Sequence, residues 1–157
     1  MTDNKPKIAI SVGDLNGIGI EIALKCHEKI SKICHPVYCI NNTMLKKASI
    51  KLKISIPENF KIHKTKGDFE IKEGMVSKKA GKYSYDSFID AINLANTKKV
   101  DAICTLPINK ESWNKANIRY KGHTEVLRDY FGKNAIMMLG CKKMFVGLFT
   151  EHIPLKK

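Results

Sequence analysis

The sequence has no apolar run near the roughly 20 residues that a helix needs to span a bilayer. Residues 1–6 carry no apolar stretch behind a basic start, so they do not have the pattern of a signal peptide. Hydrophobic residues make up 43% and charged residues 27% of the chain, a balance that excludes disordered and collagen-like proteins. We therefore expect a globular, cytoplasmic chain of 157 residues, long enough to form a stable core without disulfide bonds or bound metals.

Arginine is scarce, although the net charge is +13. Only Arg119 and Arg128 are arginines, and the other basic residues are lysines spread along the chain. Arginine is the usual reader of phosphates and guanines, whereas scattered lysine mainly keeps a surface solvated. The charge therefore favours a solvated lysine surface over a nucleic-acid interface, and we expect neither a nucleic-acid nor a membrane partner.

Paired cysteine spacings are also missing. The chain has an odd number of cysteines and no C-x-x-C, which argues against a disulfide framework or a structural zinc site. The sequence therefore predicts reduced thiols that serve as small core residues. The five cysteines are Cys26, Cys34, Cys39, Cys104 and Cys141.

Hydrophobic periodicity at the start of the chain indicates a strand, a helix and a second strand. Lys7–Val12 and Val37–Ile40 are short apolar runs typical of buried strands, and Ile18–Ile30 has helical spacing. The helix is expected to bury residues that lie four apart: Ile18, Ile22, Cys26 and Ile30. Such a unit predicts a parallel sheet with a right-handed crossover.

The remaining pattern also alternates between helices and strands. The region Ile50–Ile62, broken by Pro57, fits either edge strands or an excursion from the main sheet. Further expected helices are Ser84–Asn96, Glu111–Ala116 and Thr124–Tyr130, and further expected strands are Val100–Cys104, Ala135–Leu139 and Met144–Phe149. The fold class is therefore α/β: a three-layer sheet of mostly parallel strands with helices on both faces. Because Glu151–Lys157 follows a strand without a closing helix, we expect the chain to be incomplete.

The segment Gly13–Gly19 joins the first strand to the first helix. Its glycines match neither the dinucleotide fingerprint nor the phosphate-binding loop with its lysine. Asp14, at the carboxyl end of the strand, would repel a bare phosphate but could hold a metal, a hydroxyl or an amine. Alternatively, Asp14 simply caps the helix.

Three later segments carry polar groups suited to binding. Lys110 follows the strand Val100–Cys104 and either receives a phosphate or carboxylate or lies on a solvated loop. His123 and Thr124 stand at a helix start, where free N–H groups favour anions, although Thr124 there would also serve as a plain cap. His152 follows a strand, and a lone histidine is more often structural than a metal ligand.

Taken together, these segments resemble the 4-hydroxythreonine-4-phosphate dehydrogenase family. The segments that carry the resemblance occur in the family's order: Lys7–Leu24, Lys79–Tyr85, Thr105–Lys110, Gly122–Glu125 and His152–Leu155. The resemblance covers essentially the whole chain but only the N-terminal half of a typical member. In the turn at 13–21, Leu15 and Ile20 replace the family's two prolines.

The resemblance implies oxidation of 4-phosphooxy-L-threonine by NAD or NADP, with decarboxylation to 3-amino-2-oxopropyl phosphate, in pyridoxal 5'-phosphate biosynthesis. It implies a homodimer with a divalent metal (zinc, magnesium or cobalt) in a cleft between two α/β subdomains. His123 and Thr124 match the substrate-binding pair and His152 the first metal ligand. Asp14 and Lys110 lie in family motifs as catalytic candidates without an assigned role.

Two other functions remain open on this sequence. A dehydrogenase of a related four-carbon phosphorylated hydroxy acid, such as threonate or erythronate phosphate, would share every motif quoted. A catalytically silent phosphate-binding fragment would retain the same half. We expect residues 1–157 alone to be inactive as a dehydrogenase, because the other metal ligands and most of the NAD site would lie elsewhere.

Overall fold

The computed structural model describes residues 4–133, 136–150 and 156. The chain divides into two compact units, Met1–Arg119 and Tyr120–Lys157. Among the described residues, no helix is long and apolar enough to cross a membrane.

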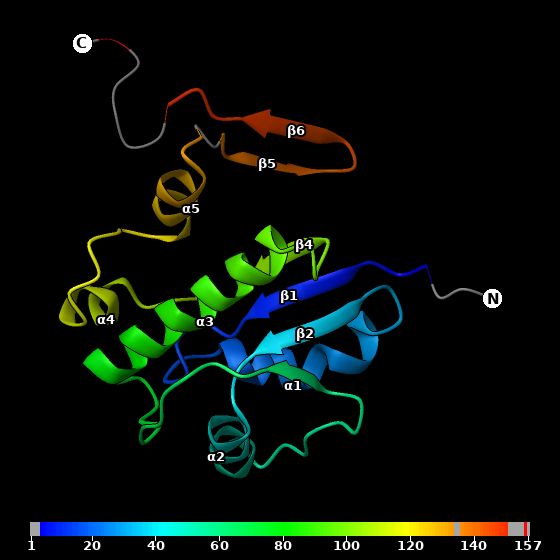
Figure 1. The fold of residues 1–157 in the computed structure, drawn as a ribbon, viewed down its shortest axis with the longest axis vertical. Coiled ribbons are helices and arrows are strands. Elements are labelled where there is room, and N and C mark those ends of the chain that lie inside the picture. Colours follow the sequence, from blue (N-terminus) through cyan, green and yellow to red (C-terminus); the bar gives the residue numbers. More distant parts are fainter. Residues whose placement is uncertain (1–3, 134–135, 151–155, 157) are drawn as a thin grey trace. The chain divides into compact units, whose positions relative to one another are not determined.

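The first unit is built on a four-stranded parallel sheet (Figure 1). Its strands are β1 (Lys7–Ser11), β2 (His35–Cys39), β3 (Lys61–His63) and β4 (Ala102–Thr105), in the order β3-β2-β1-β4. β1 therefore pairs on both sides, with Ala9 opposite Val37 in β2 and Ile103 in β4. The expected parallel sheet is confirmed, and β3 is the edge strand that the region around Pro57 suggested.

Helices cover both faces of this sheet, which confirms the three-layer α/β architecture. They are α1 (Gly19–Ile30), α2 (Asn42–Leu52), α3 (Lys78–Asn96) and α4 (Lys110–Lys115). Ile10 and Tyr38 point to one face and pack in a core with α1 and α2. Ala9 and Cys39 alternate to the other face and pack against α3.

The helix α1 is present where it was predicted, but its predicted apolar face is only partly correct, because Ile30 packs against the core and Cys26 is half-buried whereas two other residues are exposed. Ile18 is 57% and Ile22 38% exposed. The buried residues of α1 are Gly19, Ile20, Ala23, Leu24 and His27. The reason is that the buried face includes a polar residue, His27, whose ring nitrogens have hydrogen-bond partners. His27 Nδ1 lies 3.1 Å from Tyr38 Oη and its Nε2 2.9 Å from Asn59 Oδ1.

The interpretation of Ile50–Ile62 as strand-like was only partly correct. The helix α2 already covers Ile50, and only Lys61–His63 forms a strand. α2 was not predicted because it has few apolar positions. Its start nevertheless carries a recognisable capping residue. The side chain of Asn41 accepts a hydrogen bond from the N–H of Met44 at 2.9 Å.

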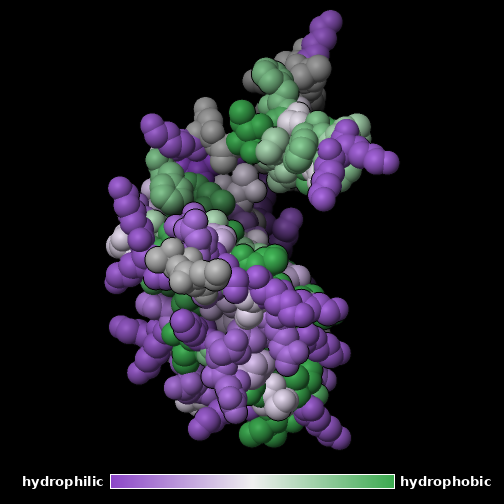
Figure 2. Space-filling view, turned by 90° about the vertical axis from the view of Figure 1, so that its right-hand side faces the viewer, coloured by the Kyte–Doolittle hydropathy of each residue, from purple (hydrophilic) through white to green (hydrophobic). Residues whose placement is uncertain are grey.

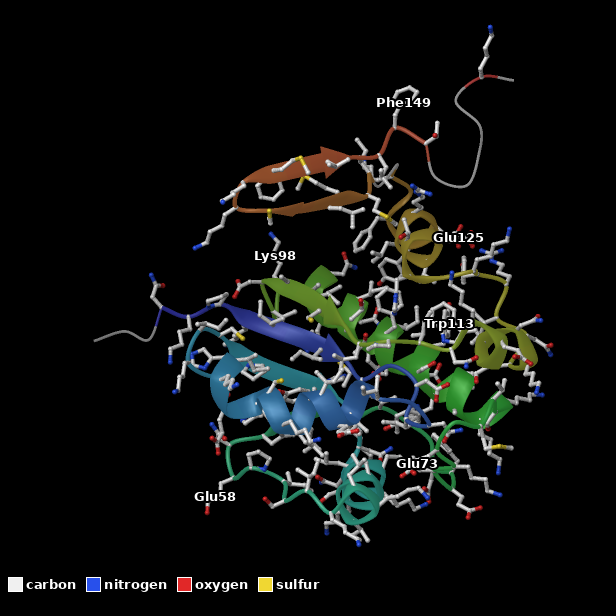
Figure 3. The ribbon with its side chains drawn as sticks, turned by 180° about the vertical axis from the view of Figure 1, so that it is seen from behind. Glu58, Glu73, Lys98, Trp113, Glu125 and Phe149 are labelled. Carbon is white, nitrogen blue, oxygen red and sulfur yellow. The ribbon has the colours of Figure 1, made fainter. Side chains whose placement is uncertain are left out.

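The contact between α3 and α4 fixes the end of the first unit. α3 begins six residues earlier than predicted, after the cap Ser77. Trp113 of α4 is fully buried, and its indole Nε1 donates to Ser84 Oγ at 2.7 Å (Figure 3). Gly81 permits the close approach of α3 to α4, because a Cβ at this position would lie 2.0 Å from the carbonyl oxygen of Ser112.

The second unit contains a helix, α5 (His123–Phe131), and an antiparallel hairpin of β5 (Met138–Cys141) and β6 (Met144–Gly147). β6 lies within its predicted region, whereas β5 overlaps its own only at Met138 and Leu139 and extends through Cys141. Ala135 lies outside the described residues. All eight strand residues are exposed. Figure 2 accordingly shows hydrophobic residues gathered on the hairpin, whereas hydrophilic residues dominate the visible face of the first unit.

Candidate functional site

The strand order creates a topological switch point between β1 and β4. From β1 the chain proceeds outward to β2 and β3, and it then returns to place β4 on the other side of β1. In open α/β sheets, ligands bind beyond the carboxyl ends of the strands at such a point. A cavity of about 190 Å³ lies there, lined by Asp14, Asn16, Gly17, Ile18, Gly74, Met75, Pro107, Ile108 and Asn109. We call it the switch-point cavity.

Asp14 contributes the acidic group of this cavity. The residue is only 4% exposed, and its backbone N–H donates to the carbonyl of Pro107 at 2.9 Å. Its carboxylate accepts hydrogen bonds from the N–H of Asn16, at 2.8 Å, and from the hydroxyl of Ser112. Burial raises the pKa of the Asp14 carboxyl above its ordinary value, and these two hydrogen bonds oppose the rise.

The alternative interpretation of Asp14 as a helix cap is wrong. α1 has Ile18 at its N-cap position and no side-chain hydrogen bond there. Asp14 instead closes a tight turn that Gly13 makes possible. Gly13 has φ of +67°, and a Cβ at that position would lie 2.2 Å from the carbonyl oxygen of Pro107. The loop after β1 and the loop after β4 are therefore in direct contact.

Asn16 forms hydrogen bonds that connect a third segment, residues 72–75, to the loop after β1. Its side-chain Oδ1 accepts from the N–H of Lys72 at 2.9 Å, and its Nδ2 donates to the carbonyl of Met75 at 2.8 Å. Its backbone carbonyl accepts from the N–H of Gly74 at 2.8 Å. Gly74 and Met75 of this segment thus line one side of the cavity. Asn16 was not among the predicted site residues, because its partners lie 56 and 59 positions away in the sequence.

Lys110 does not line the switch-point cavity. It is the exposed first residue of α4, whose N-cap, Asn109, accepts from the N–H of Ser112 at 2.8 Å. The structure therefore joins Asp14 and Asn109 in one cavity and leaves Lys110 on the surface beside it.

A larger cavity, of about 420 Å³, lies beyond the carboxyl ends of β2 and β3. Its lining residues are Asn41, Asn42, Thr43, Ile62, Lys64, Thr65, Lys66 and Gly67. Sequence analysis did not identify this cavity. Two sequence signals could have found it: the helix cap at Asn41 directly after a strand, and the polar run that follows β3.

His123 and Thr124 begin α5 in the second unit, as predicted. Gly122 occupies the N-cap position without a side-chain cap, and Glu125 Oε2 accepts from the N–H of Lys121 at 2.7 Å. Burial lowers the pKa of the His123 imidazole to about 4, so that the ring is neutral at pH 7. A neutral imidazole can both donate and accept a hydrogen bond.

The described residues do not by themselves form a metal site. No group of three or more His, Cys, Asp or Glu able to hold a metal occurs within residues 4–133, 136–150 and 156. His152, the predicted metal ligand, lies outside those residues. The switch-point cavity, with its buried carboxyl group, fits neither the pyrophosphate nor the size of a dinucleotide.

Comparisons with known proteins agree on one family. Residues 32–157 match the family model described as pyridoxal phosphate biosynthetic protein PdxA. A 4-hydroxythreonine-4-phosphate dehydrogenase of Sulfurimonas denitrificans is 60% identical over 153 residues, which cover 98% of this chain and 50% of that protein. The same enzyme of Campylobacter fetus is 56% identical, over 96% of this chain and 49% of its own length.

Solved structures agree with the sequence matches. A 4-hydroxythreonine-4-phosphate dehydrogenase from Burkholderia phymatum superposes with a TM-score of 0.81 at 28% identity, over 97% of this chain and 52% of the other. This chain spans about half the length of the curated relatives that it matches.

Proposed function

This chain belongs to the family of the pyridoxal phosphate biosynthetic protein PdxA, and we propose that it serves as part of a 4-hydroxythreonine-4-phosphate dehydrogenase. The observation that carries the proposal is the 60% identity to the Sulfurimonas dehydrogenase across 98% of this chain. In the proposed reaction, carbon 3 of 4-phosphooxy-L-threonine gives a hydride to NAD or NADP and its hydroxyl releases a proton, which leaves a ketone. Loss of carbon dioxide then gives 3-amino-2-oxopropyl phosphate.

Within this reaction, we assign substrate binding to the first turn of α5. His123 is neutral at pH 7, so it can accept a hydrogen bond from a substrate hydroxyl or donate one to a phosphate oxygen. Thr124 supplies a hydroxyl beside it. The N–H groups at the start of a helix favour negatively charged groups, which supports a phosphorylated substrate here.

The cofactors belong to the proposal as well. A divalent metal would polarise the substrate oxygen, and NAD or NADP would accept the hydride. His152 is the metal ligand that we propose from this chain. The described residues form no group of three or more metal ligands, so the other ligands would come from other parts of the complete protein or from a partner subunit. We propose a cytoplasmic homodimer as the working enzyme.

The test uses a joined polypeptide in which residues 1–157 replace the first half of the Sulfurimonas dehydrogenase and are followed by its second half. The purified joined polypeptide is assayed for NADH and NADPH formation with 4-phosphooxy-L-threonine, and with threonate and erythronate 4-phosphates for comparison. The full-length Sulfurimonas dehydrogenase is the positive control. The proposal requires the highest kcat/KM with 4-phosphooxy-L-threonine and loss of activity after chelation of metals.

Two results would contradict this proposal. A preference for a four-carbon sugar-acid phosphate would assign the related dehydrogenase activity instead. A folded joined polypeptide without activity, beside an active Sulfurimonas control, would assign this half a silent binding role. Circular dichroism of the joined polypeptide establishes that it is folded before either conclusion is drawn.

A further inference from the structure

The switch-point cavity contains one ionisable side chain, that of Asp14. The other lining residues are neutral: Asn16, Gly17, Ile18, Gly74, Met75, Pro107, Ile108 and Asn109. We propose that this cavity binds the protonated primary amine of a small molecule, with the carboxylate of Asp14 as its counter-ion.

The charge of Asp14 is not balanced within the protein. Among the described residues, no lysine, arginine or histidine forms an ion pair with Asp14, although the chain carries a net charge of +13. The groups that do contact its carboxylate, the N–H of Asn16 and the hydroxyl of Ser112, are both neutral. A buried carboxylate is costly unless a positive charge accompanies it, so a cationic ligand would remove a penalty that the free protein bears.

The carboxylate also has unused hydrogen-bonding capacity. An ionised carboxylate offers about four acceptor positions, and neighbouring groups occupy two of them. An ammonium group carries three donors and no acceptor, which complements the remaining positions. A phosphate or carboxylate ligand would instead be repelled.

A metal ion fits this cavity less well than an amine. Magnesium and calcium prefer six or more oxygen ligands, often several of them carboxylates, and no second acidic residue lines the cavity. The volume of about 190 Å³ lies below the roughly 300–1,000 Å³ of sites that enclose drug-sized ligands. The cavity therefore suits the amine-bearing end of a small molecule.

The walls of the cavity are held in place before any ligand binds. Asn16 ties residues 72–75 to the loop after β1 through three hydrogen bonds. Ser112 of α4 links the residue that precedes α3 to the loop after β1. Its Oγ accepts a hydrogen bond from the N–H of Ser77 at 3.1 Å, and its hydroxyl donates one to Asp14. Such fixed walls reduce the ordering cost of binding a ligand.

The experiment uses the ¹⁵N-labelled chain of residues 1–157 and follows backbone amide signals by NMR at pH 8. Ethanolamine is the probe, and ethylene glycol is its neutral counterpart of nearly the same shape. Potassium chloride at equal concentration controls for ionic strength and for a general cation site. We expect ethanolamine to shift the amides of Asn16 and Gly17 saturably, at least tenfold more tightly than ethylene glycol or potassium.

Two variants locate the charge responsible. Asp14→Asn keeps the size and an acceptor for the N–H of Asn16 but removes the charge, so it should weaken ethanolamine binding at least tenfold. Glu58→Gln removes an exposed carboxylate elsewhere in the first unit and should leave binding unchanged (Figure 3). The comparison of ethanolamine with ethylene glycol in the unaltered chain stands even if Asp14→Asn disturbs the loop.

Three outcomes would overturn the inference. These are equal shifts with ethanolamine and ethylene glycol, equal shifts with potassium, and unchanged ethanolamine binding in a folded Asp14→Asn chain. None of these depends on dehydrogenase activity, so this test and that of the proposed function can fail separately.

Discussion

The two units of this chain protect their strands very differently. In the first unit, β1 is hydrogen-bonded on both sides, and Ala9 at its centre is fully buried. In the second unit, every residue of β5 and β6 is exposed, including Phe145 at 66%. A two-stranded hairpin alone is at best marginally stable, whereas a sheet with helices on both faces has its own core. The first unit therefore carries the fold, and the hairpin presents apolar surface without cover among the described residues.

The largest expected effect contrasts two aromatic residues. Trp113→Ala should destabilise the chain by about 3–5 kcal/mol, because it empties a fully buried site and leaves Ser84 without its indole donor. Phe145→Ala in the exposed hairpin should change the free energy of unfolding by less than about 0.5 kcal/mol. Urea unfolding followed by circular dichroism measures both. Similar losses for the two variants would show that the hairpin is as well packed as the first unit.

The next contrast uses two glycines. Gly81→Ala should cost about 1–3 kcal/mol, since its Cβ would lie 2.0 Å from the carbonyl oxygen of Ser112. In Gly147→Ala, the Cβ meets no atom within 4 Å, so little change is expected. Thermal unfolding of the two variants side by side provides the comparison. A Gly81→Ala chain as stable as the parent would mean that α3 and α4 are packed less closely than described.

A more local effect is expected at the switch-point cavity. Asn16→Ala removes the two side-chain hydrogen bonds to Lys72 and Met75, at a cost of about 1–3 kcal/mol at the usual value of each bond. Hydrogen exchange should become faster in residues 72–77 and stay unchanged in β1. Uniformly faster exchange throughout the first unit would refute the assignment of Asn16 as a local fastening.

The smallest effects concern the pH dependence of the free energy of unfolding. The contributions of Asp14 in the first unit and His123 in the second change with pH in opposite directions. The pKa of Asp14 is raised in the folded chain, so protonation favours the folded state, and its contribution to stability grows as pH falls from 7 through the folded pKa. The pKa of His123 is lowered to about 4, so its contribution is full above about pH 6.5 and is lost between there and pH 4.

Two variants separate these contributions. Asp14→Asn should gain most stability relative to the parent at pH 7 and less at pH 5. His123→Ala should lose more relative to the parent at pH 7 than at pH 5. Urea unfolding at both pH values measures the differences, and trends of the same sign in the two variants would contradict the assigned shifts.

Much of the first unit could be predicted from the sequence. The strands around Ile10, Tyr38 and Ile103 are short apolar runs, and such runs indicate buried parallel strands directly. The face of α1 was assigned only partly correctly because the buried His27 breaks its apolar pattern, and its hydrogen-bond partners Tyr38, Asn59 and Ser31 are not evident from that pattern.

The candidate site was predictable only where it follows a strand. Asp14 is placed at the carboxyl end of β1 by local sequence, and His123 by the start of a helix. Asn16 and the side of the cavity at Gly74 and Met75 depend on contacts between distant segments, which no local pattern contains. His152 rests on the family resemblance and stays a prediction.

We propose that the first turn of α5 binds the phosphorylated substrate of a PdxA dehydrogenase. The most direct test measures kcat and KM for 4-phosphooxy-L-threonine in the joined polypeptide, with His123→Ala beside the control His63→Ala, a histidine of β3 outside the site. Loss of a hydrogen bond to a charged substrate should lower kcat/KM about 10- to 100-fold in His123→Ala and leave His63→Ala unchanged. An unaltered kcat/KM in a folded His123→Ala enzyme would contradict the account.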